Sequence, residues 1–316
     1  MTTESDILVF GGSASARLTK KICSYLGIEA AKNEILRFPD GNIFVRVLEN
    51  VRGRRVYIVQ SIAFPTNDSF VELLFWIDAL KRASADSVTA VIPYFSYAKG
   101  DKKDEPRVSI RARVCADAIE AAGADRVVCM DLHAAQLQGF FRIPVDDLYA
   151  LPILCERVLR YVQNNLVVVS PDPGFVRKAR QFSARLNAAT AIADKNRPSH
   201  DAAVEILEII GDVRGKSALI VDDFTTTGST LVNVAIELMK RGAEEVYVAI
   251  THGALAQEAV ERIDASPIRK ILMTDTVETQ PAKLSEKFDV VSVAPLFGEA
   301  IRRIHNRESI SVLFDR

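Results

Sequence analysis

The sequence predicts an α/β fold with central, mainly parallel sheets. Short apolar runs alternate with amphipathic segments along most of the chain, and this alternation is typical of strand–helix–strand units. The apolar runs are continuous, as expected of parallel strands that are buried on both faces. Seven of these runs are predicted to be strands: 7–10, 55–59, 88–92, 126–130, 166–169, 217–221 and 245–250.

Two segments carry apolar residues at helical spacing, and each follows a turn-like start. The first begins after Pro65 and the second after Gly228. A stripe of this spacing is the core face of an amphipathic helix. The stripes consist of Phe70, Leu73, Leu74, Ile77 and Leu80 in the first segment, and Leu231, Val234, Ala235, Leu238 and Met239 in the second.

Length and composition indicate two globular domains. The chain has 316 residues, of which 48% are hydrophobic, enough for two domains of about 150 residues, each with its own core. We place the domains at residues 1–148 and 149–316. We also expect the last stretch, about 15 residues, to pack back on the N-terminal domain.

Charge and cysteine content narrow the class of partner. The chain has 40 basic and 41 acidic residues and a net charge of −1, without a basic run suited to a nucleic-acid backbone, so small-molecule ligands are favoured. The four cysteines form no Cys-x-x-Cys pair, which indicates reduced, structural thiols in a cytoplasmic protein. No run approaches 18 apolar residues and no signal-like N-terminus is present, so neither membrane spanning nor secretion is expected.

The segment 218–230 (Ala-Leu-Ile-Val-Asp-Asp-Phe-Thr-Thr-Thr-Gly-Ser-Thr) is the most informative stretch of the sequence. A buried strand is predicted to end at Asp222 and Asp223, and a hydroxyl-rich loop then leads into a helix. Gly228 permits a tight turn, and loop N–H groups with the helix dipole favour a phosphate. The two carboxylates would then bind the hydroxyls of a phosphorylated sugar, directly or through Mg2+. An ordinary strand-to-helix turn with capping threonines is the alternative, and a Walker-type loop is excluded because no Gly-Lys-Ser/Thr follows.

The two halves of the chain are related in sequence. Val51-Arg-Gly53 and Val213-Arg-Gly215 lie 162 residues apart, and the same offset places Gln60-Ser61 on Asp222-Asp223. Each pair of motifs flanks a predicted strand followed by a helix, so we infer an internal duplication. The first copy lacks the paired carboxylates and the Gly-Ser-Thr. Chance similarity of two strand–helix units is the alternative.

Polar residues also follow other predicted strands. Asp131-Leu-His133 comes after the strand at 126–130, and Ser170-Pro-Asp172 comes after the strand at 166–169. Ligands bind at the carboxyl ends of parallel strands in open α/β sheets. Two further clusters are polar and charged: 194–198, which follows the strand-like segment 190–193, and 97–107. By themselves they would be interpreted as solvated loops.

Several further strings are specific when they are taken together. They are Arg-Phe-Pro-Asp-Gly at 37–41, Glu-Asn-Val-Arg-Gly at 49–53, Pro-Thr-Asn-Asp at 65–68, Asp-Leu-His-Ala-Ala-Gln-Leu-Gln-Gly-Phe-Phe at 131–141, Ser-Pro-Asp at 170–172, Asp-Lys at 194–195, Arg-Pro at 197–198, Ile-Arg-Arg at 301–303 and Glu-Ser-Ile-Ser at 308–311. With these strings the chain resembles the ribose-phosphate diphosphokinase (phosphoribosyl diphosphate synthetase) family over nearly its whole length. The family implies two duplicated phosphoribosyltransferase-type domains, the first without its own sugar-phosphate loop.

The resemblance also implies a reaction and a set of site residues. The diphosphate of MgATP would be transferred to the 1-hydroxyl of ribose 5-phosphate, with Mg2+ as cofactor and AMP as the second product. Dimers that stack into hexamers are implied, with the adenine lined by a neighbouring subunit. The implied roles are as follows: Lys195 and Arg197 are catalytic; Asp222, Asp223, Thr226, Thr227, Gly228, Ser229 and Thr230 bind ribose 5-phosphate; Phe38, Asp40, Asn42, Lys99, Gly100, Lys102 and His133 bind ATP; His133 and Asp172 hold the metal.

The chain departs from the usual family pattern at several of these positions. Asn42 replaces an acid, Lys99-Gly100 replaces Arg-Gln, and Thr226 replaces an aspartate. Phe175 stands where a second glycine is expected, and Lys178 where an arginine is usual. Three interpretations remain open: an active synthetase with a divergent nucleotide pocket, a non-catalytic regulatory subunit, and a phosphoribosyltransferase that consumes the diphosphate. The third would leave the first 150 residues without a role.

Overall fold

The computed structural model describes residues 7–162, 164–196, 206–278 and 284–314. These residues divide into two compact units. The first unit combines the described parts of 1–149, 276–278 and 292–315, and the second combines those of 150–275 and 279–291. Each unit is built around its own sheet, and each is considered by itself below.

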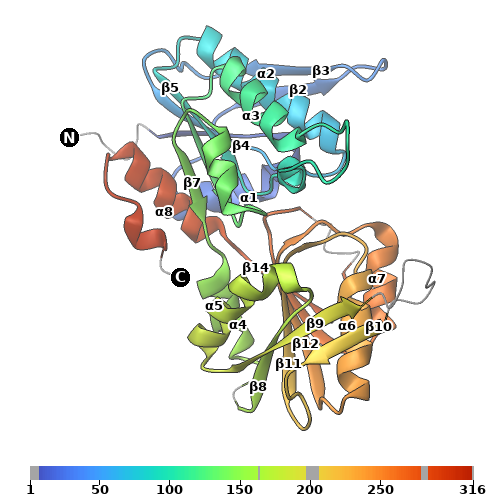
Figure 1. Ribbon diagram of the computed structural model, residues 1–316. Helices are drawn as coiled ribbons and strands as arrows, with labels where there is room; N and C mark the ends of the chain where they lie inside the picture. Colours follow the sequence, from blue (N-terminus) through green and yellow to red (C-terminus); the bar gives the residue numbers. More distant parts are fainter. Residues whose placement is uncertain (1–6, 163, 197–205, 279–283, 315–316) are drawn as a thin grey trace. The chain divides into compact units, whose positions relative to one another are not determined.

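The first unit contains a five-stranded parallel sheet in the order β1-β4-β5-β6-β7. Helix α1 packs against α8, whereas α2 packs against α3 and against β3. Strands β2 and β3 form a separate antiparallel hairpin (Figure 1). The elements are β1 (Leu8–Gly11), α1 (Ala16–Leu26), β2 (Asn33–Arg37), β3 (Ile43–Val47), β4 (Arg55–Val59), α2 (Thr66–Arg82), β5 (Ser87–Ile92), α3 (Arg111–Ala122), β6 (Arg126–Met130), β7 (Val145–Leu148) and α8 (Ala294–His305).

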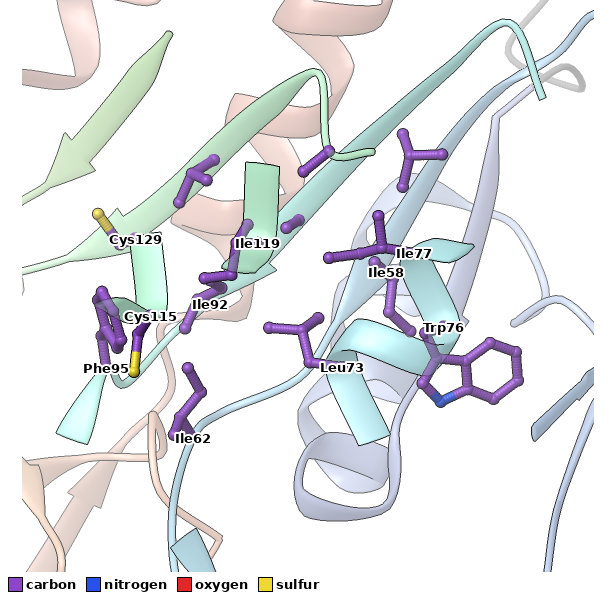
Figure 2. Packing of buried hydrophobic residues seen from close by; sticks show 14 of the residues in the cluster. Ile58, Ile62, Leu73, Trp76, Ile77, Ile92, Phe95, Cys115, Ile119 and Cys129 are labelled. Carbon is purple, nitrogen blue, oxygen red and sulfur yellow. The ribbon is translucent and has the colours of Figure 1, made fainter. Parts of the chain in front are cut away.

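Strand β4 is buried on both faces of this sheet. Ile58 lies in a buried cluster with Trp76 and Leu73 of α2. Figure 2 shows these side chains together with Ile92 of β5, which belongs to the same cluster. The neighbouring Tyr57 is fully buried on the opposite face, where its ring lies 6.3 Å from that of His305 in α8. Burial on both faces explains why the sequence of this strand is a continuous apolar run.

The second unit contains a seven-stranded sheet in the order β10-β9-β8-β11-β12-β13-β14. Neighbouring strands are parallel except for β10, which pairs antiparallel with β9. Helices α4 and α5 pack together, as do α6 and α7. The elements are α4 (Leu151–Val158), β8 (Leu166–Ser170), α5 (Val176–Leu186), β9 (Ala189–Asn196), β10 (Ile206–Ile210), β11 (Ser217–Thr225), α6 (Ser229–Lys240), β12 (Glu245–Gly253), α7 (Gln257–Asp264), β13 (Ile268–Thr274) and β14 (Phe288–Val291).

Short 3₁₀ helices complete the connections of both units. Two of them, η3 and η5, lie next to residues that the sequence assigns to ligand sites. The 3₁₀ helices are η2 (Ser13–Ser15), η3 (Ser96–Lys99), η4 (Ala135–Phe140), η5 (Pro173–Phe175) and η7 (Ser311–Phe314).

The predicted α/β class and all seven predicted strands are confirmed, and three strands, β9, β11 and β12, extend beyond their predicted ends. Strand β11 continues through Asp222 and Asp223 to Thr225, because its pairing with β12 extends to Gly253. Strand β9 continues through Lys195 to Asn196, because β10 pairs with it along its whole polar end. The strands that the sequence did not predict are β2, β3, β7, β10, β13 and β14.

The four cysteines are free and buried. Burial raises the pKa of the Cys23 and Cys115 thiols to about 11 and that of Cys155 to about 12, and it holds the pKa of Cys129 well above its usual range. These thiols are therefore poor nucleophiles at neutral pH. In the part of the chain that the structure describes, no helix is long and apolar enough to cross a membrane.

Candidate functional site

Asp222 and Asp223 lie near the carboxyl end of β11, the strand between β8 and β12 in the sheet of the second unit. The Asp223 side chain is buried and that of Asp222 is half-buried. The backbone N–H of Asp223 donates to Oδ1 of Asp222 over 2.9 Å. The carboxyl ends of parallel strands are where open α/β sheets bind ligands, so this acid pair is well placed for the hydroxyls of a sugar.

Two carboxylates this close affect each other's protonation. Removal from water is the main reason that the pKa of Asp222 lies well above its usual range, and repulsion by the Asp223 carboxylate adds to it. The Asp172 carboxylate contributes in the same direction, which places it within electrostatic reach. A ligand that offers hydroxyl donors or a cation to this pair would relieve the repulsion.

The loop after β11 turns sharply into α6. Gly228 is in the left-handed region (φ 70°), and a Cβ added there would lie 3.1 Å from Ile263 in α7. The Gly228 N–H donates to Oγ1 of the buried Thr225 over 3.2 Å. The Thr226 carbonyl accepts the N–H of Ala256 over 2.9 Å. These contacts hold the turn and leave the hydroxyl groups of its outer residues at the surface.

The outer residues of this loop expose their hydroxyl groups. Thr226, Thr227 and Ser229 are exposed, and Thr230 is half-buried in the first turn of α6. The hydroxyls of Thr227 and Ser229 lie 2.9 Å apart, and the Ser229 N–H points at Oγ1 of Thr227. Hydroxyl donors at a helix N-terminus suit a phosphate. The structure therefore brings the predicted ribose 5-phosphate residues, 222, 223 and 226–230, into one strand–loop–helix segment.

Asp172 follows β8, the neighbour of β11 in the sheet. Its Oδ1 accepts the N–H of Phe175 over 3.0 Å and so caps η5, while the hydroxyl of Ser170 donates to its carbonyl over 2.6 Å. The ring of Phe175 lies 5.5 Å from the ammonium of Lys178. The side chain of Phe175 thus turns towards α5, and Asp172 itself stays exposed.

The two residues assigned to catalysis are placed unequally. Lys195 is in β9, where its backbone pairs with Leu207. Arg197 lies outside the described residues. The segment around Lys195 is thus a strand rather than the polar loop that the sequence indicated.

Three of the predicted ATP residues lie at the tip of the β2–β3 hairpin in the first unit. The Phe38 N–H donates to the Asn42 carbonyl, and the Asn42 N–H donates to Oδ1 of Asp40, over 2.9 and 3.0 Å. All three side chains are exposed. The Phe38 ring packs edge-on against Phe44, 6.4 Å away. An exposed ring next to polar side chains can stack on a base.

Three more of the predicted ATP residues, Lys99, Gly100 and Lys102, lie at the end of η3 or just after it. The start of α2 contacts both η3 and the hairpin. Asp68 of α2 forms an ion pair with Arg37, next to the hairpin tip, at 2.5 Å. Asn67 accepts a hydrogen bond from the hydroxyl of Tyr97 in η3. Lys99 and Gly100 come directly after Tyr97 and Ala98, and Lys102 is exposed two residues further on. Asn67 and Asp68 stood in a motif of the sequence but were assigned no role.

His133 lies in the turn after β6, and its side chain is exposed. The turn is fixed at two points: the Asp131 N–H donates to the Leu148 carbonyl over 2.9 Å, and the Leu132 N–H donates to Oδ1 of Asp147 over 3.1 Å. Asp131 adopts a positive φ of 45°. The buried Asp147 was not predicted from the sequence, because its partner lies on another strand.

The donor chemistry fits Mg2+ at one of the two predicted ligands. Magnesium prefers hard oxygen ligands and is commonly bound by one or two carboxylates together with substrate phosphates. The exposed carboxylate of Asp172 satisfies this requirement. The imidazole of His133 is a softer donor, better suited to hydrogen bonding with a phosphate. Among the described residues, no group of three or more His, Cys, Asp or Glu side chains is arranged to hold a metal ion.

A parallel sheet that ends in two carboxylates, followed by a hydroxyl-rich loop at a helix N-terminus, defines a phosphoribosyltransferase-type α/β protein. The comparisons with known proteins are more specific. Residues 7–123 match the family model of the N-terminal domain of ribose phosphate pyrophosphokinase, and residues 203–315 match that of the phosphoribosyl synthetase-associated domain. The chain therefore belongs to the ribose-phosphate pyrophosphokinase family, which confirms the resemblance found in the sequence.

Similarity to individual relatives extends over almost the whole chain. A ribose-phosphate pyrophosphokinase of Caldanaerobacter subterraneus is 48% identical over 311 residues, 98% of each chain. The one of Rhizobium meliloti is 47% identical over 97% of this chain and 99% of its own. The crystal structure of phosphoribosylpyrophosphate synthetase from Mycobacterium smegmatis superimposes with a TM-score of 0.91 at 36% identity, covering 96% of this chain and 99% of its own.

Proposed function

We propose that this protein transfers the β,γ-diphosphate of MgATP to the 1-hydroxyl of ribose 5-phosphate, giving 5-phosphoribosyl 1-diphosphate and AMP for nucleotide biosynthesis. The sugar oxygen forms a bond to the β-phosphorus, the bond from that phosphorus to the α,β-bridging oxygen breaks, and the hydroxyl proton is lost. The observation that carries the proposal is the β11–α6 segment, where two carboxylates precede a loop of exposed hydroxyls. Membership of the family supports it.

On the ribose side, we assign the 5-phosphate to the loop at residues 226–230 and the 2- and 3-hydroxyls to Asp222 and Asp223. Hydroxyl donors and the N-terminus of α6 favour the phosphate dianion. Hydrogen bonds from sugar hydroxyls to carboxylates are charge-assisted and directional. The assignment explains why two like charges are retained next to each other despite the raised pKa of Asp222.

On the ATP side, we assign the nucleotide to the hairpin tip, to the residues after η3 and to His133. Phe38 would stack on the adenine, with Asp40 and Asn42 beside it. Lys99 and Lys102 would bind the polyphosphate, with Gly100 between them in the chain. We further propose a homo-oligomer built from dimers, in which Phe38 serves the adenine of a neighbouring subunit.

Catalysis in this scheme consists of charge stabilisation. Negative charge develops on the bridging oxygen as AMP leaves, and fixed cations lower the barrier without covalent chemistry. We assign this role to Lys195 and Arg197: lysine supplies a compact point charge and arginine a planar fork of donors. Asp172 would hold Mg2+, which would supply neutralisation of phosphate charge.

The test is AMP release from ATP and ribose 5-phosphate in the presence of Mg2+. We expect AMP and 5-phosphoribosyl 1-diphosphate in equal amounts, and no AMP when ribose 5-phosphate or Mg2+ is omitted. The sugar product is detected by its consumption in a separate phosphoribosyltransferase reaction. No turnover at millimolar substrates, with a folded and assembled protein, would rule out the activity and leave the regulatory subunit. Consumption of added 5-phosphoribosyl 1-diphosphate with a free base would indicate a phosphoribosyltransferase instead.

A further inference from the structure

The side chain of Arg111 occupies the space next to Gly100. A Cβ added at Gly100 would lie 2.7 Å from Nε, 2.9 Å from Cβ and 3.3 Å from Cζ of Arg111. A real Cβ essentially never lies within 3.0 Å of such an atom, so any larger residue at position 100 would displace the arginine. The backbone of Gly100 has φ −95° and ψ 48°, which other residues can adopt. Glycine is therefore required here for space and not for backbone conformation.

The backbone fixes these two residues next to each other. The N–H of Ala112 donates to the carbonyl of Gly100 over 3.1 Å, so the end of η3 and the first turn of α3 are joined. Helix α3 begins at Arg111. The residues between them, 101–110, form a loop whose two ends are held together by this bond. The fold therefore places the start of the Arg111 side chain next to Gly100.

Charge distinguishes Arg111 from two other arginines of the first unit. Arg82 and Arg113 are each paired with an aspartate one turn away in the same helix. Arg111 is exposed, and among the residues that the structure describes no carboxylate pairs with it. Residues 99–111 contain five basic and three acidic side chains. An arginine without an acidic partner, in a basic segment, keeps its five N–H donors available for an anion.

We propose that Arg111 is a nucleotide-binding residue whose guanidinium, seated in the space left by Gly100, binds the polyphosphate of ATP beside Lys99. This inference rests on the proposed function, which assigns Lys99 and Gly100 to ATP. The family pattern has Arg-Gln where this chain has Lys99-Gly100, so an arginine and an amide donor are missing from the expected positions. Arg111 restores a planar fork of donors at the same place from another element, the N-terminus of α3.

The principal test compares Arg111→Gln with Arg111→Lys and with the remote control Arg82→Gln. Glutamine keeps most of the packing but removes the charge. We expect Arg111→Gln to raise the Kd of a non-hydrolysable ATP analogue and the KM for ATP by roughly ten- to a hundred-fold. The KM for ribose 5-phosphate should change by less than about two-fold, which separates binding from general structural damage. Arg111→Lys should lie between, because it keeps the charge without the fork.

Gly100→Ala provides a second test that leaves all charges in place. The backbone accepts alanine, but its Cβ would collide with Arg111, so the guanidinium must move. We expect weaker ATP binding in the same direction as for Arg111→Gln. The control is Gly139→Ala, because a Cβ at Gly139 meets nothing within 4 Å. Thermal melting of each variant verifies that it folds.

The outcomes separate this inference from the proposed function. A wild-type protein that makes AMP and the sugar diphosphate, together with an Arg111→Gln variant whose ATP Kd and KM are unchanged, would overturn the role of Arg111 and leave the function intact. A folded wild-type protein that neither binds nor turns over ATP would overturn both. Weaker ATP binding in both Arg111→Gln and Gly100→Ala, with unchanged Arg82→Gln and Gly139→Ala, supports the inference.

Discussion

The junctions between β4 and α2 in the first unit and between β11 and α6 in the second are equivalent positions of a duplicated fold. We call the first the closed junction, because buried side chains fill it, and the second the open junction, because it exposes hydroxyl groups. Gln60 and Ser61 follow β4 with fully buried side chains. Their counterparts, Asp222 and Asp223, are carboxyl groups, and the loop after them exposes Thr226 and other hydroxyls. The same strand–loop–helix frame therefore serves two different purposes.

The closed junction is filled by its own polar side chains. Oε1 of Gln60 accepts the N–H of Ala14 over 3.0 Å, and Nε2 donates to the Ser69 carbonyl over 3.3 Å. The buried Glu72 accepts the N–H of Ser13 over 2.7 Å. Each buried group is satisfied within the unit, which stabilises the fold. The open junction leaves its donors for a ligand instead, and the difference explains why only one copy is a candidate sugar-phosphate site.

The largest effect is expected from Asp223→Asn at the open junction. The substitution keeps the shape but removes the charge that would bind a sugar hydroxyl. We expect kcat/KM for ribose 5-phosphate to fall roughly a hundred-fold while the KM for ATP changes little. The measurement is initial-rate AMP release with either substrate varied. Asp212→Asn, an exposed acid of the same unit, is the control. Normal ribose 5-phosphate kinetics in Asp223→Asn would remove the acid pair from the site.

At the closed junction, Glu72→Leu should reduce stability by about 3 kcal/mol. The buried indole N–H of Trp76, which donates to Glu72 over 3.3 Å, would lose its acceptor, and so would the partly buried N–H of Ser13. Denaturant unfolding, followed by Trp76 fluorescence, measures the loss. Glu72→Gln retains an acceptor oxygen and should lose less. An unchanged unfolding midpoint in Glu72→Leu would show that the network does not hold this junction closed.

A smaller effect is expected from Gly228→Ala in the turn of the open junction. The left-handed φ costs any other residue about 1–2 kcal/mol, and the new Cβ would press on Ile263. Gly53→Ala is the matched control, because Gly53 has φ 67° with nothing within 4 Å of the added Cβ. Both variants should melt at lower temperature, but only Gly228→Ala should raise the KM for ribose 5-phosphate. Equal KM values would mean that the turn does not shape the phosphate site.

The elements that could be predicted from the sequence are those whose pattern is carried by residues close together in the chain. Strands such as β4 and β11 are continuous apolar runs because both faces are covered, and 222–230 combines its functional residues within one short segment. Strand β10 was missed, because nothing in its sequence specifies that it folds back antiparallel on β9. The polar end of β9 was assigned to a loop for the same reason: its backbone partners come from another strand.

Other features of the junctions and of the predicted ATP residues depend on contacts between residues that are far apart in the sequence, so the sequence did not predict them. Glu72 and Ser13 are 59 residues apart, and their hydrogen bond depends on how α2 packs beside η2. In the sequence Gly100 was only a departure from the family pattern, whereas the structure shows that the side chain of Arg111 fills the space next to it. A departure from a family pattern therefore has to be judged with its three-dimensional neighbours and not by position alone.

The smallest expected effect concerns the stability of the ligand-free open junction and its dependence on pH. Burial and the Asp223 carboxylate hold the pKa of Asp222 above its usual range, so its protonated form is favoured in the folded state. The contribution of protonated Asp222 to the free energy of unfolding is fully present below the pKa that an aspartate has in the unfolded chain, about 3.9. It is lost as the pH rises through the raised pKa of the folded state. Gln60, the neutral counterpart in the first unit, carries no such cost.

Asp222→Asn places a neutral amide at the open junction, as the closed junction already has. We expect this variant to melt at a higher temperature than the wild type at about pH 8 and the difference to shrink towards about pH 4, because the wild-type carboxyl is then protonated. Calorimetry of both proteins across this range measures the effect. The same variant should bind ribose 5-phosphate less well, so the substitution would trade affinity for stability. If the melting temperatures of the two proteins changed with pH in parallel, the acid pair would not lower the stability of the folded state. The two junctions would then differ only in shape.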